Sequence, residues 1–128
     1  MAKNILLIAL GGGLGAVLRW LLAGLIKPPA TGPFAGFPVW IFIVNVTGCF
    51  LFGLLNGFCT ARGEEWRLAI LTGILGGYTT FSTFGWDTYR LLRDGQPGLA
   101  VLNAVGSVVA GVLAVWAGVV LSGRGTPS

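Results

Sequence analysis

The sequence predicts an all-α membrane protein with four transmembrane helices. Of its 128 residues, 55% are hydrophobic and only 9% are charged, whereas a soluble domain usually has about 25% charged residues. The apolar residues gather in four long runs, which are separated by segments rich in charge, proline or glycine. Because so few charges are available to face water, lipid is the expected solvent of this chain.

Each apolar run is long enough to cross the hydrocarbon core, which takes about 20 helical residues. The first run ends at a Lys-Pro-Pro sequence, and a loop rich in proline and glycine follows it. Trp40 is placed to anchor the second run at the lipid headgroups. Residues 61–67 are expected to form a short aqueous loop, and residues 124–128 a polar tail. The chain is predicted to be a single domain, residues 1–128, with spans at about 4–26, 39–59, 68–92 and 99–121.

Basic residues give little indication of how the chain is oriented in the membrane. The net charge is +4, and most bases lie at the ends of the apolar runs, so nucleic-acid binding is not expected. Two interpretations fit: the chain inserts in both orientations and pairs as an antiparallel dimer, or one loop decides an ordinary insertion. The predicted sides carry four bases against three: Lys3, Arg62, Arg67 and Arg124 on one, and Lys27, Arg90 and Arg93 on the other.

Small residues recur at four-residue spacing in every run, which favours close packing of helices in lipid. The neighbour can be a helix of the same chain or of another subunit. The rows are Gly11 and Gly15, Gly53 and Gly57, Gly73 and Gly77, and Gly106, Ala110, Ala114 and Gly118.

The third run contains the most informative segment, Gly73-Ile-Leu-Gly-Gly-Tyr-Thr-Thr-Phe-Ser-Thr-Phe84. Two adjacent glycines and four serine and threonine residues are a poor composition for a plain membrane helix, so a break at mid-membrane is predicted, with the run interrupted at residues 76–80. Freed backbone groups are tolerated at that depth only where protein or a water-filled cavity covers them. The carbonyl end of such a break can hold a small cation, and its amide end favours an anion. A flexible kink without a ligand is the alternative.

Two polar side chains lie inside predicted spans. Arg19 either snorkels to the headgroups beside Trp20 or sits in an aqueous vestibule, where its charge attracts anions. Asn45 either bonds a neighbouring helix or presents its NH₂ group to a permeating anion.

Aromatic and hydroxyl residues follow the predicted break. Phe81 and Phe84 are three residues apart and share a helix face, with Ser82 and Thr83 between them. Ring edges are positive, so an anion can be held edge-on while hydroxyls replace part of its water. Ordinary packing of the two rings against lipid or core is the alternative.

The fourth run carries Asn103 and Ser107, which are four residues apart and share a face. Together with Asn45 they form a row of hydrogen-bond donors, which suggests a pathway, although bonding between helices would need the same residues.

Acidic residues are scarce in the spans, where only Asp87 occurs, near the end of the third run. Asp87 is a candidate for proton coupling, but a salt bridge to an arginine is the simpler interpretation. The chain has no histidine, so a transition-metal site is not expected. No nucleophile–base pair or phosphate-binding loop is present, and no enzymatic activity is predicted.

Three motifs resemble the Fluc, or CrcB-like, family of fluoride channels, and the resemblance covers nearly the whole chain. The third motif is the most specific. They are Gly11-Gly-Gly-x-Gly-Ala-x-x-Arg19, Val44-Asn-x-x-Gly-x-Phe-x-x-Gly53 and Gly73-x-x-Gly-Gly-x-Thr-Thr-Phe-Ser-Thr-Phe84.

The resemblance implies a passive, fluoride-selective channel of the bacterial inner membrane that lowers cytoplasmic fluoride. It implies an antiparallel, dual-topology homodimer with two pores and a structural Na⁺ at its centre, held by the backbone carbonyls of Gly76 and Thr79. Arg19 would lie in the vestibule. The fluoride pathway would comprise Asn45, Phe81, Ser82, Thr83, Phe84, Asn103 and Ser107.

This sequence departs from the family pattern at two positions. Asn103 stands where the family often has Tyr, and Asp87 stands where it often has Glu. Two other functions remain open: a small multidrug-type exporter, which would normally carry an acid in the first span, and a non-transporting membrane assembly subunit. The first span, at about 4–26, has no acid.

Overall fold

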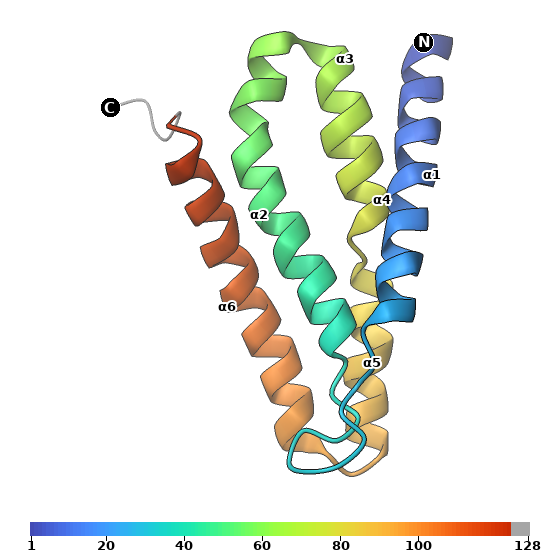
Figure 1. Cartoon of the computed structure of the whole chain (residues 1–128), viewed down its shortest axis with the longest axis vertical. Helices are drawn as coiled ribbons and strands as arrows, with labels where there is room; N and C mark the ends of the chain where they lie inside the picture. Colours follow the sequence, from blue (N-terminus) through green and yellow to red (C-terminus); the bar gives the residue numbers. More distant parts are fainter. Residues whose placement is uncertain (124–128) are drawn as a thin grey trace.

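The computed structural model describes residues 1–123, and every regular element in that part of the chain is helical (Figure 1). The predicted polar tail, including Arg124, lies outside the described residues. In chain order the elements are α1 (Ala2–Leu25), α2 (Val39–Arg62), α3 (Glu64–Trp66), η1 (Arg67–Leu75), α4 (Gly76–Tyr78), α5 (Phe81–Arg93) and α6 (Pro97–Leu121).

Three helices, α1, α2 and α6, are long and apolar enough to cross a membrane, with 24, 24 and 25 residues. They correspond to the first, second and fourth predicted spans, and each begins or ends within about three residues of the expected boundary. The third predicted span is divided among η1, α4 and α5, of which α5 is the longest with 13 residues. The all-helical, membrane-spanning class predicted from composition is therefore confirmed for these three helices.

The predicted aqueous loop at residues 61–67 is wrong, because α2 continues to Arg62 and α3 begins at Glu64. Gly63 alone reverses the chain, with a φ of 105° that side chains other than glycine rarely adopt. Glu64 and Glu65 occupy the first turn of α3, where negative charge is favourable at a helix N-terminus. They also contact the start of α1: Lys3 Nζ pairs with Glu65, and Asn4 Nδ2 donates to Glu64 Oε1 at 3.4 Å.

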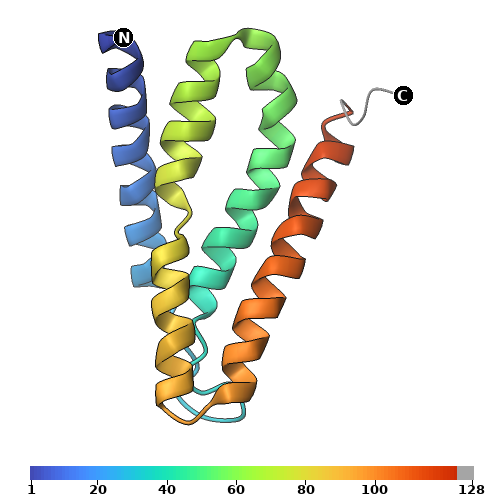
Figure 2. The same cartoon turned by 180° about the vertical axis from the view of Figure 1, so that it is seen from behind.

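The helices stand side by side (Figures 1 and 2): α2 lies between α6 and η1, whereas α5 contacts α6 directly. Both the α1–α2 loop and the α5–α6 turn lie at one end, and the α2–α3 turn lies at the other. α2 supplies much of the core, because Ile41, Val44 and Cys59 are completely buried. This places the middle of α2 directly beside the middle of the third run.

Glycines set the close approach between α1 and the third run. A Cβ atom on Gly15 would overlap the Ile74 carbonyl oxygen and lie 2.7 Å from Tyr78 N. A Cβ atom on Gly77 would overlap the Gly12 carbonyl oxygen and lie 2.9 Å from Gly12 Cα. In each case the obstacle is backbone, which cannot swing aside as a side chain can. The small-residue rows of the first and third runs therefore pack against each other within one chain.

A second pair of glycines joins α2 to α6. Gly53 faces the backbone of Val115, and Gly118 faces the backbone of Phe50 and Leu54, with no room for a Cβ atom at either glycine. Gly106, in contrast, meets only Leu102 of its own helix at 3.8 Å. The predicted four-residue row of the last span is thus used within the chain at Gly118 but not at Gly106.

The non-helical part of the third run is shorter than the predicted five residues. Gly76, Gly77 and Tyr78 are helical, while Thr79 (φ −80°, ψ 157°) and Thr80 (φ −150°, ψ 122°) are extended. The expectation that the glycine pair is unwound is wrong: these glycines are helical, and contact with α1 explains Gly77. We call Thr79 and Thr80 the extended corner.

Candidate functional site

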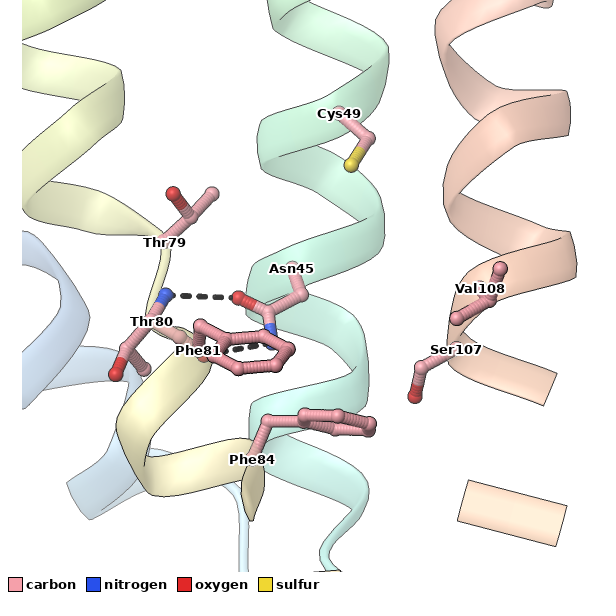
Figure 3. Close-up of a pocket in the computed structure, with 8 residues that line it drawn as sticks. All are labelled: Asn45, Cys49, Thr79, Thr80, Phe81, Phe84, Ser107 and Val108. Carbon is pink, nitrogen blue, oxygen red and sulfur yellow. Dashed lines mark hydrogen bonds between the residues drawn. The ribbon is translucent and has the colours of Figure 1, made fainter. Parts of the chain in front are cut away.

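The extended corner is held by the side chain of Asn45 on α2. Thr80 N donates to Asn45 Oδ1 at 2.9 Å, and Asn45 Nδ2 donates to the Thr80 carbonyl oxygen at 3.1 Å. The Asn45 amide thus pairs with both the backbone N–H and the backbone carbonyl of Thr80, which make no helical hydrogen bonds. This satisfies the requirement that buried backbone groups be paired. Figure 3 shows both bonds beside the corner.

Thr80 N is also the group that an uninterrupted α-helix would direct to the Gly76 carbonyl. Here this donor goes to Asn45 Oδ1, while Thr79 N remains on the Leu75 carbonyl at 3.0 Å. The Gly76 carbonyl oxygen therefore loses its regular helical partner. The corner thus leaves the Gly76 carbonyl oxygen available for another ligand.

Arg19 reaches the same corner from α1. Its Nη1 donates to the Thr79 carbonyl oxygen at 3.1 Å, and the side chain lies at intermediate exposure. A hydrogen bond from a charged donor is stronger than one between neutral groups. Arg19 therefore fastens α1 to the corner and places a positive charge there.

Thr80 begins α5 as its N-cap residue. Its Oγ1 accepts from Thr83 N at 3.3 Å, an arrangement that satisfies one of the unpaired amides at a helix start. The same oxygen lies 3.2 Å from Thr83 Oγ1 and 3.3 Å from Ser82 Oγ. The Ser-Thr hydroxyls are thus engaged with Thr80 at the amide end of the corner.

Two phenylalanines of the first turn of α5 stand beside the corner. The Phe81 and Phe84 rings have centroids 5.6 Å apart and are tilted by 38°. Phe81 is 84% exposed in the single chain, so its own chain does not cover the ring. In Figure 3 the Phe84 ring extends from α5 toward Ser107 on α6.

These groups border a cavity of about 260 Å³ between α2, α5 and α6. Most of its lining is apolar, and a few polar atoms converge on it, which is the usual composition of a small-ligand site. Its lining residues, shown in Figure 3, are Asn45, Cys49, Thr79, Thr80, Phe81, Phe84, Ser107 and Val108.

Further polar side chains lie on α5 and α6, and one hydrogen bond joins the two helices. Asn103 is completely buried, and its Nδ2 donates to Thr88 Oγ1 at 2.9 Å. Asp87 Oδ1 lies 3.3 Å from Arg90 Nη2, so the salt bridge expected for Asp87 is present. Ser107 Oγ is buried, and no hydrogen-bond partner for it occurs among the described residues.

The structure brings only some of the sequence-predicted residues together. Asn45, Phe81, Phe84 and Ser107 share the cavity, and Asn103 lies one turn beyond Ser107. Ser82 and Thr83 are not among the lining residues. Arg19, Gly76 and Thr79 meet at or beside the corner.

Sequence reasoning missed three lining residues: Cys49, Thr80 and Val108. Thr80 carried a usable signal, because threonine directly before a helix is a favoured N-cap. Cys49 and Val108 carried none, since apolar residues in a membrane helix look alike whether they face a cavity or lipid.

Comparison with known proteins places the chain in a family. A family model described as "CrcB-like protein, Camphor Resistance (CrcB)" matches residues 6–119. A protein of Solibacter usitatus named "Fluoride-specific ion channel FluC" is 46% identical over 122 residues, covering 93% of this chain and 98% of its own length. A protein of Pyrococcus abyssi with the same name is 37% identical over 125 residues, covering 95% and 98%. With these motifs, this helical arrangement and matches over nearly its full length, the chain belongs to the CrcB-like family.

Proposed function

We propose that this protein is a fluoride-selective channel, not an enzyme, that lets fluoride leave the cell passively and so lowers the cytoplasmic concentration. Its relatives are named as fluoride channels. The observation that carries the proposal is the convergence of Phe81, Phe84, Asn45 and Ser107 on one cavity next to the extended corner. A membrane-spanning pathway fits the three long apolar helices, and the bacterial inner membrane is the proposed location.

Fluoride holds its water tightly, so a path through lipid must replace that water with other donors. Asn45 Nδ2 carries two hydrogens and uses one of them on Thr80. Ser107 Oγ lies buried in the cavity wall. The positive edges of Phe81 and Phe84 add a weak attraction to an anion, and Arg19 supplies a positive potential at the corner. Ser82, Thr83 and Asn103 would extend this series of donors away from the rings.

The proposal includes a fourth crossing of the membrane by the third run. Residues 67–93 would cross as a helix broken at the extended corner, with Arg67 and Arg93 near opposite surfaces. A break at that depth is tolerated because Asn45 and Arg19 satisfy the corner.

The channel would be an antiparallel homodimer with dual topology. A single chain leaves Phe81 84% exposed, together with apolar residues along α6 such as Val112 and Trp116. A second copy would enclose the ring pair and complete a water-lined path, and the near balance of basic residues permits insertion in both orientations. Two copies give two cavities and therefore two pathways.

A structural Na⁺ would be held by the carbonyl oxygens of Gly76 and Thr79. The chemistry fits, because backbone carbonyls at an unwound helix are a known type of Na⁺ ligand, and the Gly76 carbonyl has lost its helical donor to Asn45. Thr79 O also accepts from Arg19, so this oxygen would offer the cation its second lone pair. When bound, the cation would supply a fixed positive charge at the corner.

Purified protein in liposomes tests the function. Vesicles loaded with potassium fluoride or potassium chloride receive a potassium ionophore, and ion-selective electrodes record the efflux. We expect fluoride to leave much faster than chloride, and vesicles without protein set the background. Equal rates for the two halides would disprove selectivity, and proton-driven efflux of a bulky cation would instead favour an exporter.

A further inference from the structure

Tyr78 is the last helical residue before the extended corner, and its residue exposure is only 8%. On the α1 side, a Cβ atom on Gly15 would lie 2.7 Å from Tyr78 N. On the α2 side, a Cβ atom on Gly48 would lie 3.3 Å from Tyr78 Cδ1. Two helices therefore touch Tyr78, α1 at its backbone and α2 at its ring.

The buried ring ends in a hydroxyl that bonds Thr47 on α2. Tyr78 Oη lies 2.8 Å from Thr47 Oγ1. Thr47 Oγ1 also lies 2.7 Å from the Ile43 carbonyl oxygen and 3.1 Å from the Val44 carbonyl oxygen. A hydroxyl carries a single hydrogen, and Thr47 directs its own toward these carbonyls. Tyr78 is therefore the donor, and Thr47 Oγ1 is the acceptor.

Thr79, the next residue, packs against the same turn of α2. Its Oγ1 donates to the Leu75 carbonyl oxygen at 3.0 Å, which fixes the rotation of the side chain. The Cγ2 methyl group then fills the space beside Gly48, where a Cβ atom would overlap it. Glycine at position 48 thus leaves room for the first residue of the corner.

One turn of α2 therefore contacts three successive residues of the third run. The contacts pair Thr47 with Tyr78, Gly48 with Thr79, and Asn45 with Thr80. Asn45 holds the second residue of the corner, whereas the bond to Thr47 holds the residue directly before the corner. Because Thr79 and Thr80 both line the cavity, a shift of Tyr78 would move part of the cavity wall.

We propose that Tyr78 is a positioning residue for fluoride conduction: its bond to Thr47 holds the extended corner in place against α2. This inference rests on the proposed channel function, and it adds a residue that does not itself line the cavity. Without the bond, the turn before the corner can move away from α2. The donors that replace the water of fluoride would then no longer converge on one position.

Fluoride efflux from proteoliposomes tests this role, with the melting temperature in detergent measured on the same preparations. Tyr78→Phe keeps the buried ring and removes only the hydroxyl. We expect the initial efflux per reconstituted protein, measured well below the melting transition, to fall about tenfold, which corresponds to about 1.4 kcal/mol at the barrier. Tyr89→Phe is the matched control, because it removes the hydroxyl of the other tyrosine, which is 55% exposed; its efflux should not change.

Substitutions of Thr47 test the same bond from the other side. Thr47→Val removes the acceptor at nearly constant volume and should reproduce the loss seen in Tyr78→Phe. Thr47→Ser keeps a hydroxyl and should retain the efflux of the unmodified protein. A variant that combines Tyr78→Phe with Thr47→Val should lose no more than either single variant, since two residues that act through one bond are not additive.

The outcomes separate this inference from the proposed function. Absence of fluoride efflux from the unmodified protein would refute the channel and this inference together. Full efflux from Tyr78→Phe and Thr47→Val would refute the positioning role and leave the channel standing, even if both melting temperatures fall. Losses that multiply in the combined variant, or equal losses in Thr47→Ser and Thr47→Val, would overturn the inference as well. If Tyr78→Phe fails to reconstitute, the comparison of Thr47→Val with Thr47→Ser still decides the question.

Discussion

The two halves of the third run differ sharply in how far the single chain buries their side chains. Before the extended corner, Leu71 and Leu75 are only 6% and 4% exposed, and glycines bring α1 to within backbone contact. After the corner, Phe81 and Trp86 are 84% and 58% exposed, and the buried face of α5 carries Asp87. The first half is therefore packed within its own chain, and the second half has unfinished surfaces.

This contrast indicates a division of labour along one run of sequence. Backbone contacts between helices have no adjustable side chain, so the first half forms a rigid support. The second half begins at an N-cap and carries the rings, the hydroxyls and the buried acid. The corner joins this support to the rings and so fixes where the rings lie. Substitutions in the first half should therefore lower stability, whereas substitutions of the rings should lower conduction.

The largest effect is expected from Gly77→Ala in the support. Its methyl group would overlap the Gly12 carbonyl oxygen, and α1 must move away at a cost of about 1–3 kcal/mol. We expect a lower melting temperature in detergent and loss of fluoride efflux. Gly13→Ala is the control, because a Cβ atom there meets nothing within 4 Å; equal stability of the two variants would contradict the proposed support.

The next effect should come from Asn45→Ala, which removes both bonds to Thr80. Each of these part-buried hydrogen bonds contributes about 0.5–1.5 kcal/mol, so the corner should lose its fixed geometry and efflux should fall. Asn45→Asp keeps the acceptor for Thr80 N but turns a second acceptor oxygen toward the Thr80 carbonyl oxygen, so it should not restore the stability lost in Asn45→Ala. Asn56→Ala, on the exposed face of the same helix, should behave like the unmodified protein in a melting assay. Equal melting temperatures for all three variants would show that Asn45 does not hold the corner.

Substitutions of the rings should spare the fold and act on conduction alone. Phe81→Ile and Phe84→Ile each remove a ring edge from the cavity, and a loss of about 1.4 kcal/mol at the barrier slows efflux tenfold. Size-exclusion profiles and melting temperatures should change little for Phe81→Ile, since this ring is mostly exposed in the chain. Phe34→Ile, in the α1–α2 loop, is the matched control, and full activity of both ring variants would count against a pore role.

The smallest effect is expected at the far end of the support. Lys3→Gln removes an ion pair with Glu65 in which both side chains are more than half exposed, at 66% and 58%. Exposed pairs contribute no more than about 1 kcal/mol, so stability in detergent should decrease slightly, and less at high salt. A large loss of efflux would show that this end also takes part in conduction.

Much of the fold followed from local patterns. Apolar runs of the required length predicted the helices that became α1, α2 and α6, because lipid leaves a hydrophobic segment few other ways to satisfy its backbone. The Thr-Thr-Phe-Ser-Thr-Phe sequence from Thr79 to Phe84 indicated the region of the site. The exact extended residues did not follow, because two adjacent glycines suggest unwinding equally well whether they bend a helix or admit a neighbouring one.

The sequence alone determined that this protein is helical, that it spans a membrane and that many of its polar side chains within the membrane lie in the third run. Only the tertiary structure decided which groups meet there. Arg19 bonds Thr79 across 60 positions of sequence, and Asn45 bonds Thr80 across 35. No local pattern encodes such pairs, since a buried backbone group takes whichever donor or acceptor the packing of the helices brings within reach.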